Sequence, residues 1–378
     1  MARFDHPMGL DFDASGDLWV ADQGNEKLRK ITFGPQPSVS SPALVSSIGG
    51  LDMGTPIVFS FMRSVRYLAG RLYVTASGGV YRIDPTTTPM LATVLIPLDK
   101  LQDAGDLTIS GDSLYVTDAS LGAVWRFPLA TPLPGSLFAG ENTFSAVSLD
   151  GVGTSARLQH GRWLANDGAG NVYFSEDHTV RRLAIGSAQV TTIAGRGRHA
   201  GTTSMPPRLD GPFGVAFDGS DSFYITDAGG NTIRKWVRST NTLSTIAGSG
   251  SYDHKDDVGT NAAFWAPHGI ARDSSGNLYV ADFSNHCLRK ITSGGVVTTI
   301  VGHAKVQGDA QPTNDTNGAD IYLRYPDGLA YDGDQTLFLA DSGNGVVLRI
   351  SLADTTYKTS IVAGDPTVRG HKNGVGQA

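Results

Sequence analysis

The stretch PHGIARDSSGNLYVADFSNHCLRKI, residues 267–291, holds a pattern that recurs along the whole chain. Its centre is a short apolar strand that ends on a small or acidic residue, and an arginine followed by another apolar residue comes a few positions later. Internal repetition at a period of tens of residues is typical of solenoids and propellers, so it is the strongest indication of the fold. The seven copies of the strand are LWVAD at 18–22, LYVTA at 72–76, LYVTD at 114–118, VYFSE at 172–176, FYITD at 223–227, LYVAD at 278–282 and LFLAD at 337–341.

Each repeat predicts four β-strands and almost no helix. Apolar and polar residues alternate with a period of two inside the copies, and aromatic and β-branched residues dominate them. In the sixth repeat we expect strands at residues 269–271, 278–282, 287–291 and 296–301, with a tight turn at 273–276. Four strands repeated seven times predict an all-β fold, a closed β-propeller of seven four-stranded blades. If two weak repeats share one blade, the alternative is a six-bladed ring.

A ring of contiguous blades needs no internal boundary, so residues 1–378 are expected to form a single domain. The blade units are predicted at about residues 6–50, 62–98, 104–140, 161–195, 212–248, 267–302 and 326–364.

The two chain ends predict how the ring closes. The loop before the fourth unit reads DGVGTSARL at 150–158, the chain ends with NGVGQA at 373–378, and it begins, after Met1, with ARF at 2–4. Joined tail to head, the ends nearly recreate that loop. We therefore expect the tail, 365–378, to meet residues 2–7, with adjacent N- and C-termini; a frayed end of an open array is the alternative.

Several of these units resemble NHL repeats. The resemblance is carried by the runs at 7–31, 267–291 and 326–350, each with a leading proline and a strand ending in Ala-Asp. It covers nearly the whole chain and is weakest in the second and third units, where the leading proline is lost. Members of the NHL-repeat β-propeller family commonly have six blades, whereas seven units are counted here.

Composition narrows the classes of function. A net charge of -6 gives no overall electrostatic footprint for nucleic acid, although Arg181, Arg182, Arg196 and Arg198 lie close in sequence. RNA-binding NHL proteins use basic faces, so we expect no nucleic-acid partner. One cysteine, Cys287, excludes internal disulfides and is expected to be buried.

The cellular setting is predicted only from weak signals. No apolar run is long enough to span a membrane, and the start of the chain contains no signal peptide. Because the chain starts and stops within a repeat, we expect a domain of a longer protein. Few lysines, many Ser and Thr residues and a glycosylation sequon at residues 314–316 favour an extracellular or periplasmic location.

Residues that recur in nearly every unit are interpreted as parts of the frame. The second strands end on carboxylates that could suggest a metal site, but we expect backbone amides or an arginine across the hairpin to hold them. Likewise Asp11, Asp13, Ser15 and Asp17 imitate a calcium loop but are expected to form a hairpin turn. The carboxylates are Asp22, Asp118, Glu176, Asp227, Asp282 and Asp341, and the arginines in the same units are Arg29, Arg126, Arg182, Arg234, Arg289 and Arg349.

Positions that vary while the frame stays constant are better candidates for function. One such position lies just before the first strand of each unit, and in a closed ring these residues point toward the same channel mouth. Arginine, histidine and aspartate beside apolar residues would form a mixed pocket for an anionic or carboxylate-bearing ligand. A purely structural channel lining is the alternative. The seven residues, called the mouth residues below, are Met8, Arg63, Ala104, Arg162, Phe213, His268 and Asp327.

An enzyme is the less favoured interpretation. Amidating lyases with NHL-like repeats hold a metal through three histidines from separate blades, and only His268 stands at a matching place here. His160, His254, His303 and His371 lie on loops between blades, without a short metal spacing. We therefore expect no cofactor, with calcium or zinc as the alternative, and no catalytic or metal residue is assigned.

Long loops between blades favour a recognition surface. The connections at 249–267 and 303–326 far exceed the usual two to six residues. Phe264, Leu158 and Phe4 recur and are expected to anchor these loops, whereas Tyr252 and His254 do not recur and are candidates for contact. The predicted function is a non-catalytic module that binds a protein or glycan partner. The alternatives are a metal-dependent lyase or hydrolase with its site at the channel mouth, and a structural spacer. The candidate binding residues are Arg63, Arg162, Phe213, His268, Asp327, Tyr252 and His254.

Overall fold

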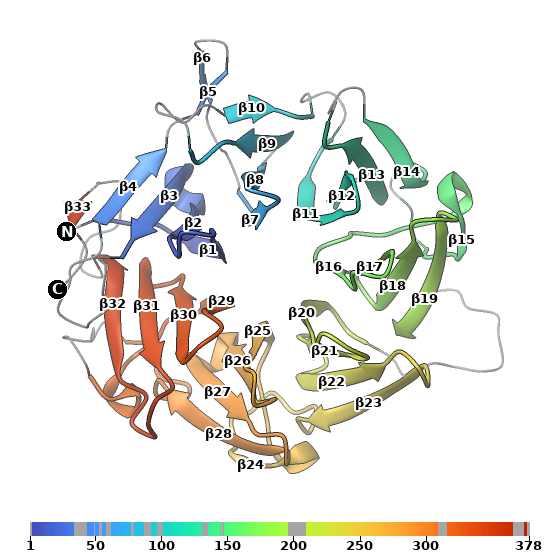
Figure 1. The fold of residues 1–378 in the computed structure, drawn as a ribbon. Coiled ribbons are helices and arrows are strands. Elements are labelled where there is room, and N and C mark those ends of the chain that lie inside the picture. The colour runs from blue at the N-terminus through green and yellow to red at the C-terminus, as the bar shows by residue number, and fades with distance from the viewer. Residues whose placement is uncertain are drawn as a thin grey trace.

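The computed structural model shows the chain as a ring of blades around a central axis (Figure 1). It describes residues 2–33, 44–48, 50–52, 55–57, 62–76, 79–86, 92–96, 101–130, 135–143, 145, 147–195, 209–308, 316–365 and 374–375.

Seven antiparallel sheets form the blades in these residues, and the strands of each sheet follow one another from the centre of the ring to its rim. The seven-bladed prediction is therefore confirmed, and the six-bladed alternative is wrong. Blade 1 contains β1 (Pro7–Phe12), β2 (Leu18–Asp22), β3 (Lys27–Thr32) and β4 (Leu44–Ile48). Blade 2 contains β7 (Ser64–Leu68), β8 (Arg71–Ala76), β9 (Gly79–Ile83) and β10 (Ala92–Val94). Blade 3 contains β11 (Ala104–Ser110), β12 (Ser113–Asp118), β13 (Ala123–Pro128) and β14 (Ser136–Gly140).

The remaining blades repeat this order. Blade 4 contains β16 (Leu164–Asn166), β17 (Asn171–Ser175), β18 (Thr179–Ala184) and β19 (Gln189–Gly195). Blade 5 contains β20 (Pro212–Phe217), β21 (Ser222–Asp227), β22 (Thr232–Val237) and β23 (Thr242–Ala247). Blade 6 contains β25 (Pro267–Arg272), β26 (Leu278–Asp282), β27 (Cys287–Ile291) and β28 (Val296–Val301). Blade 7 contains β29 (Pro326–Tyr331), β30 (Thr336–Asp341), β31 (Val346–Ser351) and β32 (Thr359–Gly364).

Short elements decorate this frame. A hairpin of β5 (Gly50–Asp52) and β6 (Thr55–Ile57) lies between blades 1 and 2 in the chain. The helical content of the described residues consists of single 3-10 turns at Gln23–Asn25, Gly153–Ser155, Gly259–Asn261, Phe283–Asn285 and Gly318–Asp320.

The tail closes the ring as an outer strand of blade 1. The connection before blade 4 adds β15 (Gly151–Val152) to the outer edge of β19, and the one before blade 6 adds β24 (Asp257–Val258) to β28. The tail strand β33 (Gly374–Val375) makes the same addition to β4 of blade 1. The end of the chain therefore replaces the missing connection before the first blade.

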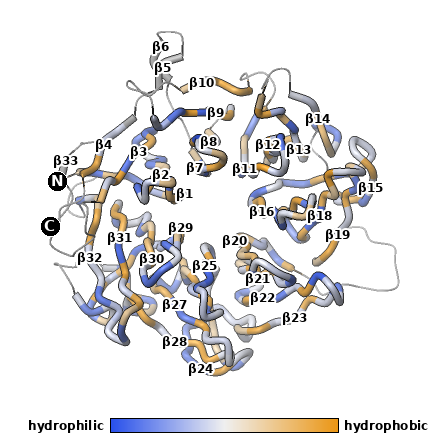
Figure 2. Tube along the Cα trace, viewed as in Figure 1, coloured by the Kyte–Doolittle hydropathy of each residue, from blue (hydrophilic) through white to orange (hydrophobic). Residues whose placement is uncertain are grey.

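The core is divided among the boundaries between blades. Apolar side chains of each blade pack on those of the next, and Figure 2 shows hydrophobic and hydrophilic residues alternating along the strands. At the closing boundary, Phe338 and Val347 of blade 7 lie in one buried cluster with Leu10 and Val20 of blade 1. Face-to-face packing at every boundary explains why the ring holds without capping repeats.

Glycines let the innermost strands approach one another. A Cβ atom on Gly269 would lie 2.2 Å from the carbonyl oxygen of Asp327 in the next blade, and one on Gly328 would lie 2.1 Å from that of Met8. No side chain fits at such distances. The glycine of each Pro-x-Gly start thus brings neighbouring backbones together, while the residue before it reaches the channel mouth.

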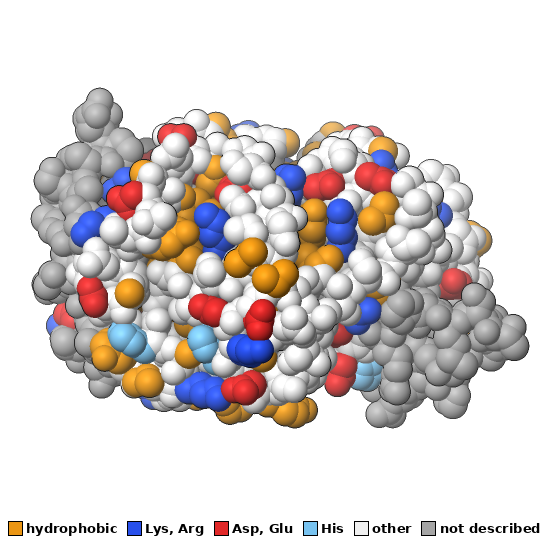
Figure 3. Space-filling model, turned by 90° about the horizontal axis from the view of Figure 1, so that it is seen from below, with side chains coloured by type: hydrophobic (Ala, Val, Ile, Leu, Met, Phe, Trp, Pro, Cys, Tyr) orange, Lys and Arg blue, Asp and Glu red, His pale blue; other side chains and the backbone are white. Residues whose placement is uncertain are grey.

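The anchors predicted for the loops are confirmed. Phe4, Leu158 and Phe264 are all buried between blades. Cys287 is also buried, as expected. Seen edge-on, the described surface mixes Lys and Arg with Asp and Glu side chains (Figure 3). Among the described residues, no helix is long and apolar enough to cross a membrane. Arg196, Arg198, His371 and residues 314–315 of the sequon lie outside the described residues.

Candidate functional site

Six of the seven mouth residues lie around one end of the channel, where three adjoining cavities open; the exception is Ala104. The first, between blades 7 and 1, has a volume of about 500 Å³ and includes Met8 and Asp327. The second, of about 300 Å³, shares Met8 with the first and also contains Arg63. The third, of about 450 Å³, shares Arg162 with the second and contains His268. The cavities therefore form a continuous band along the mouth.

A row of stacked rings crosses this mouth. The imidazole of His268 lies between Phe213 and Phe283, with ring centroids 4.0 Å apart on each side and interplanar angles of 13° and 17°. Trp163 packs beyond Phe213 at 5.8 Å, and Tyr325 packs beyond Phe283 at 5.0 Å. We call these five side chains the aromatic row. The three central rings are stacked, whereas Trp163 and Tyr325 are tilted against them by 56° and 38°. Together the five side chains form a packed aromatic wall.

Two arginines flank the second cavity. Arg63 pairs with Asp103 at 2.7 Å, and Arg162 lies 3.8 Å from Asp177, so both retain free donor groups at the surface. Between them blade 3 contributes Gly105, which has no side chain, and Asp106. This spacing leaves room for a ligand beside two forked donors.

Ala104 was predicted at this place, but it pairs with Asp118 as Pro7 pairs with Asp22, so it occupies the proline position of its blade and is buried in the core.

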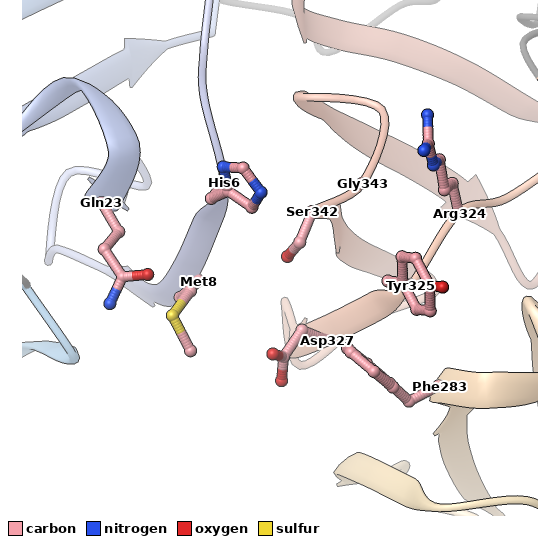
Figure 4. Close-up of a pocket in the computed structure, with 9 residues that line it drawn as sticks. All are labelled: His6, Met8, Gln23, Phe283, Arg324, Tyr325, Asp327, Ser342 and Gly343. Carbon is pink, nitrogen blue, oxygen red and sulfur yellow. The ribbon is translucent and has the colours of Figure 1, made fainter.

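Asp327 lies in the first cavity, which we call the closure pocket (Figure 4). Its carboxylate points toward Met8 across the pocket. His268 lies beside it, with Nδ1 3.4 Å from a carboxylate oxygen. Both residues occupy the same position in consecutive blades, which explains why the ring brings them side by side.

Of the two loop residues predicted for contact, only Tyr252 reaches the mouth. Tyr252 is 74% exposed and borders the third cavity together with Trp265, which is 40% exposed. His254 instead turns to the outer strand β28, where its Nε2 lies 2.7 Å from the Thr299 hydroxyl. The structure therefore brings six of the seven candidate residues to the mouth and leaves His254 outside it.

Sequence analysis missed Phe283, Gln23 and Ser342, which also line the closure pocket. Each follows directly after the acidic end of a second strand, a position that varies from blade to blade. This variation between blades is the same signal that marks the mouth residues, so it could have identified these three residues as well.

The acidic ends of the second strands are buried and hold the loops that enter each blade. Asp22 accepts a hydrogen bond from the backbone N–H of Asp5 at 2.8 Å, and Asp282 accepts one from Trp265 at 2.8 Å. Equivalent bonds reach Asp118, Glu176, Asp227 and Asp341. The structural interpretation of this carboxylate ring is confirmed. Asp13 likewise accepts backbone bonds from Ser15 and Asp17, as expected of a hairpin turn.

Arginines reach these carboxylates in half of the predicted pairs. The nitrogen-to-oxygen distances are 3.8 Å for Arg29–Asp22, 3.3 Å for Arg234–Asp227 and 2.9 Å for Arg289–Asp282. The pairs predicted for Arg126, Arg182 and Arg349 are wrong. Each of these arginines lies an even number of residues after the acid, so it projects from the opposite face of its strand. In blade 4, Arg181 takes the expected place and pairs with Glu176 at 3.0 Å.

Asp341 gives a prediction for the pH dependence of stability. Burial raises the pKa of Asp341 to about 7. The hydrogen bonds that its carboxylate accepts from the Arg324 backbone N–H and the Asn344 amide lower the pKa, but by less than burial raises it. Between its unfolded value of 3.8 and that pKa the folded chain holds an extra proton, so stability falls as the pH rises. Between pH 5 and pH 7.5, the free energy of unfolding of the parent should fall by about 2–3 kcal/mol more than that of Asp341→Asn, as measured by urea unfolding. Parallel profiles would mean that Asp341 is already ionised in the folded protein at pH 5.

A metal site would need several His, Cys, Asp or Glu side chains around one point. Among the described residues, no group of three or more such side chains is placed to hold a metal ion. His160 pairs with Asp177 at 2.8 Å, and His303 stacks on Tyr322 at 4.2 Å.

Comparisons with known proteins relate the chain to several others. The sequence profile of the Teneurin NHL domain matches residues 253–376. Teneurin-1 of Gallus gallus is 26% identical over 60% of this chain, and NHL repeat-containing protein 2 of Homo sapiens is 25% identical over 90% of it. The chain spans 9% of the first relative and 49% of the second.

Solved structures share the fold. A catalytically inactive virginiamycin B lyase from Staphylococcus aureus, determined with quinupristin, superimposes with a TM-score of 0.59 at 11% identity. The match covers 89% of this chain and 91% of the other. At this identity the likeness concerns the propeller alone.

Proposed function

Since the chain belongs to the NHL-repeat β-propellers, we propose that it is a recognition module that binds a protein or glycan partner at the channel mouth. One observation carries this proposal: the residues that differ between blades gather on one face, over three adjoining cavities. A rigid frame with variable residues at one end is suited to recognition. The extracellular or periplasmic setting and the longer parent protein belong to the same proposal.

The exposed rings beside the third cavity allow a direct test. Exposed Trp and Tyr side chains often contribute most of the binding energy of an interface. A panel of purified ectodomains and an array of defined glycans would be screened against the chain. Any binder should lose at least about ten-fold in affinity to the double variant Tyr252→Ala with Trp265→Ala, measured on a biosensor.

A matched control is available in the same blade. Val258 and Val296 are exposed on the outer strands β24 and β28, away from the mouth. Their double change to serine should leave affinity unchanged. Equal affinities for the mouth variant and the rim variant would exclude this face as the binding surface.

A metal-dependent lyase or hydrolase at the mouth is the alternative, favoured by the proximity of His268 and Asp327. Elemental analysis of the purified chain separates the two functions. One tightly held zinc or calcium ion per chain in the parent, and none in the Asp327→Asn variant, would favour catalysis over recognition.

A further inference from the structure

The carboxylate of Asp327 is buried at the mouth and accepts no hydrogen bond within the described residues. Its residue is 7% exposed, and its side chain 9%. Within the described residues its ion-pair neighbour is His268, whose Nδ1 makes no hydrogen bond although it lies 3.4 Å away. A buried carboxylate is unfavourable unless it is paired or hydrogen-bonded. The closure pocket therefore contains an acceptor that the described chain leaves unsatisfied.

The neighbouring carboxylates are satisfied within the fold. Asp106 accepts bonds from the Arg66 guanidinium at 2.9 Å and from the backbone N–H of Leu164 at 3.0 Å. Asp103 accepts one from Arg63 at 2.7 Å. Asp210 at the third cavity also accepts no hydrogen bond from a described residue at its carboxylate, but its side chain is 67% exposed to water. Among the described acids that line the three cavities, Asp327 is therefore the buried one without a donor.

The walls of the pocket suit an apolar stem that ends in a cation. Met8 lies opposite the carboxylate, and Phe283 lies beside it (Figure 4). Arg324, the cation that also lines the pocket, lies beyond Tyr325 with its guanidinium directed away from Asp327. The negative charge at the base of the pocket is therefore not neutralised by this arginine.

The same geometry disfavours a sugar ring in this pocket. His268 stacks on one face of Phe283 at 4.0 Å, and Tyr325 packs against Phe283 at 5.0 Å with a tilt of 38°, so this ring is a poor platform for a flat sugar ring. Two of the donors near Asp327 are already used inside the fold: Gln23 Nε2 donates to the Met62 carbonyl, and Ser342 Oγ donates to the Pro7 carbonyl.

We propose that the closure pocket receives a basic side chain, lysine or arginine, from a protein partner. The charged head pairs with Asp327, and the aliphatic stem packs on Met8 and Phe283, as long basic side chains do against apolar surfaces. A volume of about 500 Å³ accommodates such a side chain. This inference rests on the proposed function and specifies the partner's chemistry.

Small probes test the pocket without a known partner. The chain has six methionines, so the methyl signal of Met8 can be followed by NMR after labelling and assigned with Met8→Leu. N-acetyl-lysine amide and N-acetyl-arginine amide should shift this signal saturably, whereas the uncharged N-acetyl-norleucine amide should bind at least about ten-fold more weakly. Asp327→Asn, which keeps the shape of the side chain, should lose the same factor.

A second variant covers the case in which Asp327→Asn does not fold. Met8→Lys places a cation opposite the carboxylate and should block both probes while raising the melting temperature. Equal binding of the norleucine amide, unchanged binding by Asp327→Asn, or binding of a neutral saccharide instead would overturn the assignment. If partners still depend on Tyr252 and Trp265, the proposed function survives that outcome; if no partner depends on the mouth, the proposed function fails.

Discussion

Gly328→Ala should lower the free energy of unfolding by about 3 kcal/mol or more, because it forces apart the first and last blades. The added methyl carbon would lie 2.1 Å from the carbonyl oxygen of Met8. That oxygen belongs to the backbone of β1, so relief requires a movement of the whole inner strand. Urea unfolding of the parent and the variant, followed by tryptophan fluorescence, measures the loss.

Two further substitutions give this prediction its controls. Gly186→Ala adds the same methyl group where no atom lies within 4 Å, and it should change stability by less than about 0.5 kcal/mol. Gly269→Ala, with its clash of 2.2 Å against Asp327 in the next blade, should resemble Gly328→Ala. A loss as small as that of Gly186→Ala would show that the inner strands adapt freely and that the glycines do not set their spacing.

The fold could be predicted because its signals are local and repeated. The strand period, the turn at 273–276 and the acidic strand ends all lie within one repeat. Ring closure could also be predicted, because the tail contains the same Gly-Val sequence that forms β15 before blade 4. The role of Gly269 was not readable, since its constraint comes from the neighbouring blade rather than from its own turn.

The site was predictable only where position in the repeat determines direction. Phe213, His268 and Asp327 share one position, and the ring brings them to one mouth. His254 lies on a loop whose path no repeat specifies, so its bond to Thr299 could not be foreseen. Arg181 was missed for another reason: the hairpin of blade 4 is two residues shorter, which places the pairing arginine five residues after the acid instead of seven.

Arg289→Ala should lower the free energy of unfolding by about 3–5 kcal/mol, because it leaves the carboxylate of Asp282 buried without its cation. The guanidinium is fully buried, and its Nη1 lies 2.9 Å from Asp282. It also donates to the carbonyl oxygens of Ala263 and Lys255, each at 2.9 Å, and lies 4.8 Å from the ring centroid of Phe264. One side chain thus ties the loop that carries Tyr252 to blade 6.

The matched comparison is Arg126→Ala. Arg126 lies 3.7 Å from Asp112, whose side chain is 91% exposed, and its Nε donates to the Ser113 hydroxyl at 2.9 Å, so its loss should cost about 1–2 kcal/mol. Arg289→Lys should fall between the two variants, because it keeps the charge but loses the forked geometry. Urea unfolding ranks the three proteins, and hydrogen exchange of residues 255–264 reports on the loop. If Arg289→Ala lowers the free energy of unfolding no more than Arg126→Ala does, backbone hydrogen bonds alone hold the buried carboxylates and the loop that carries Tyr252.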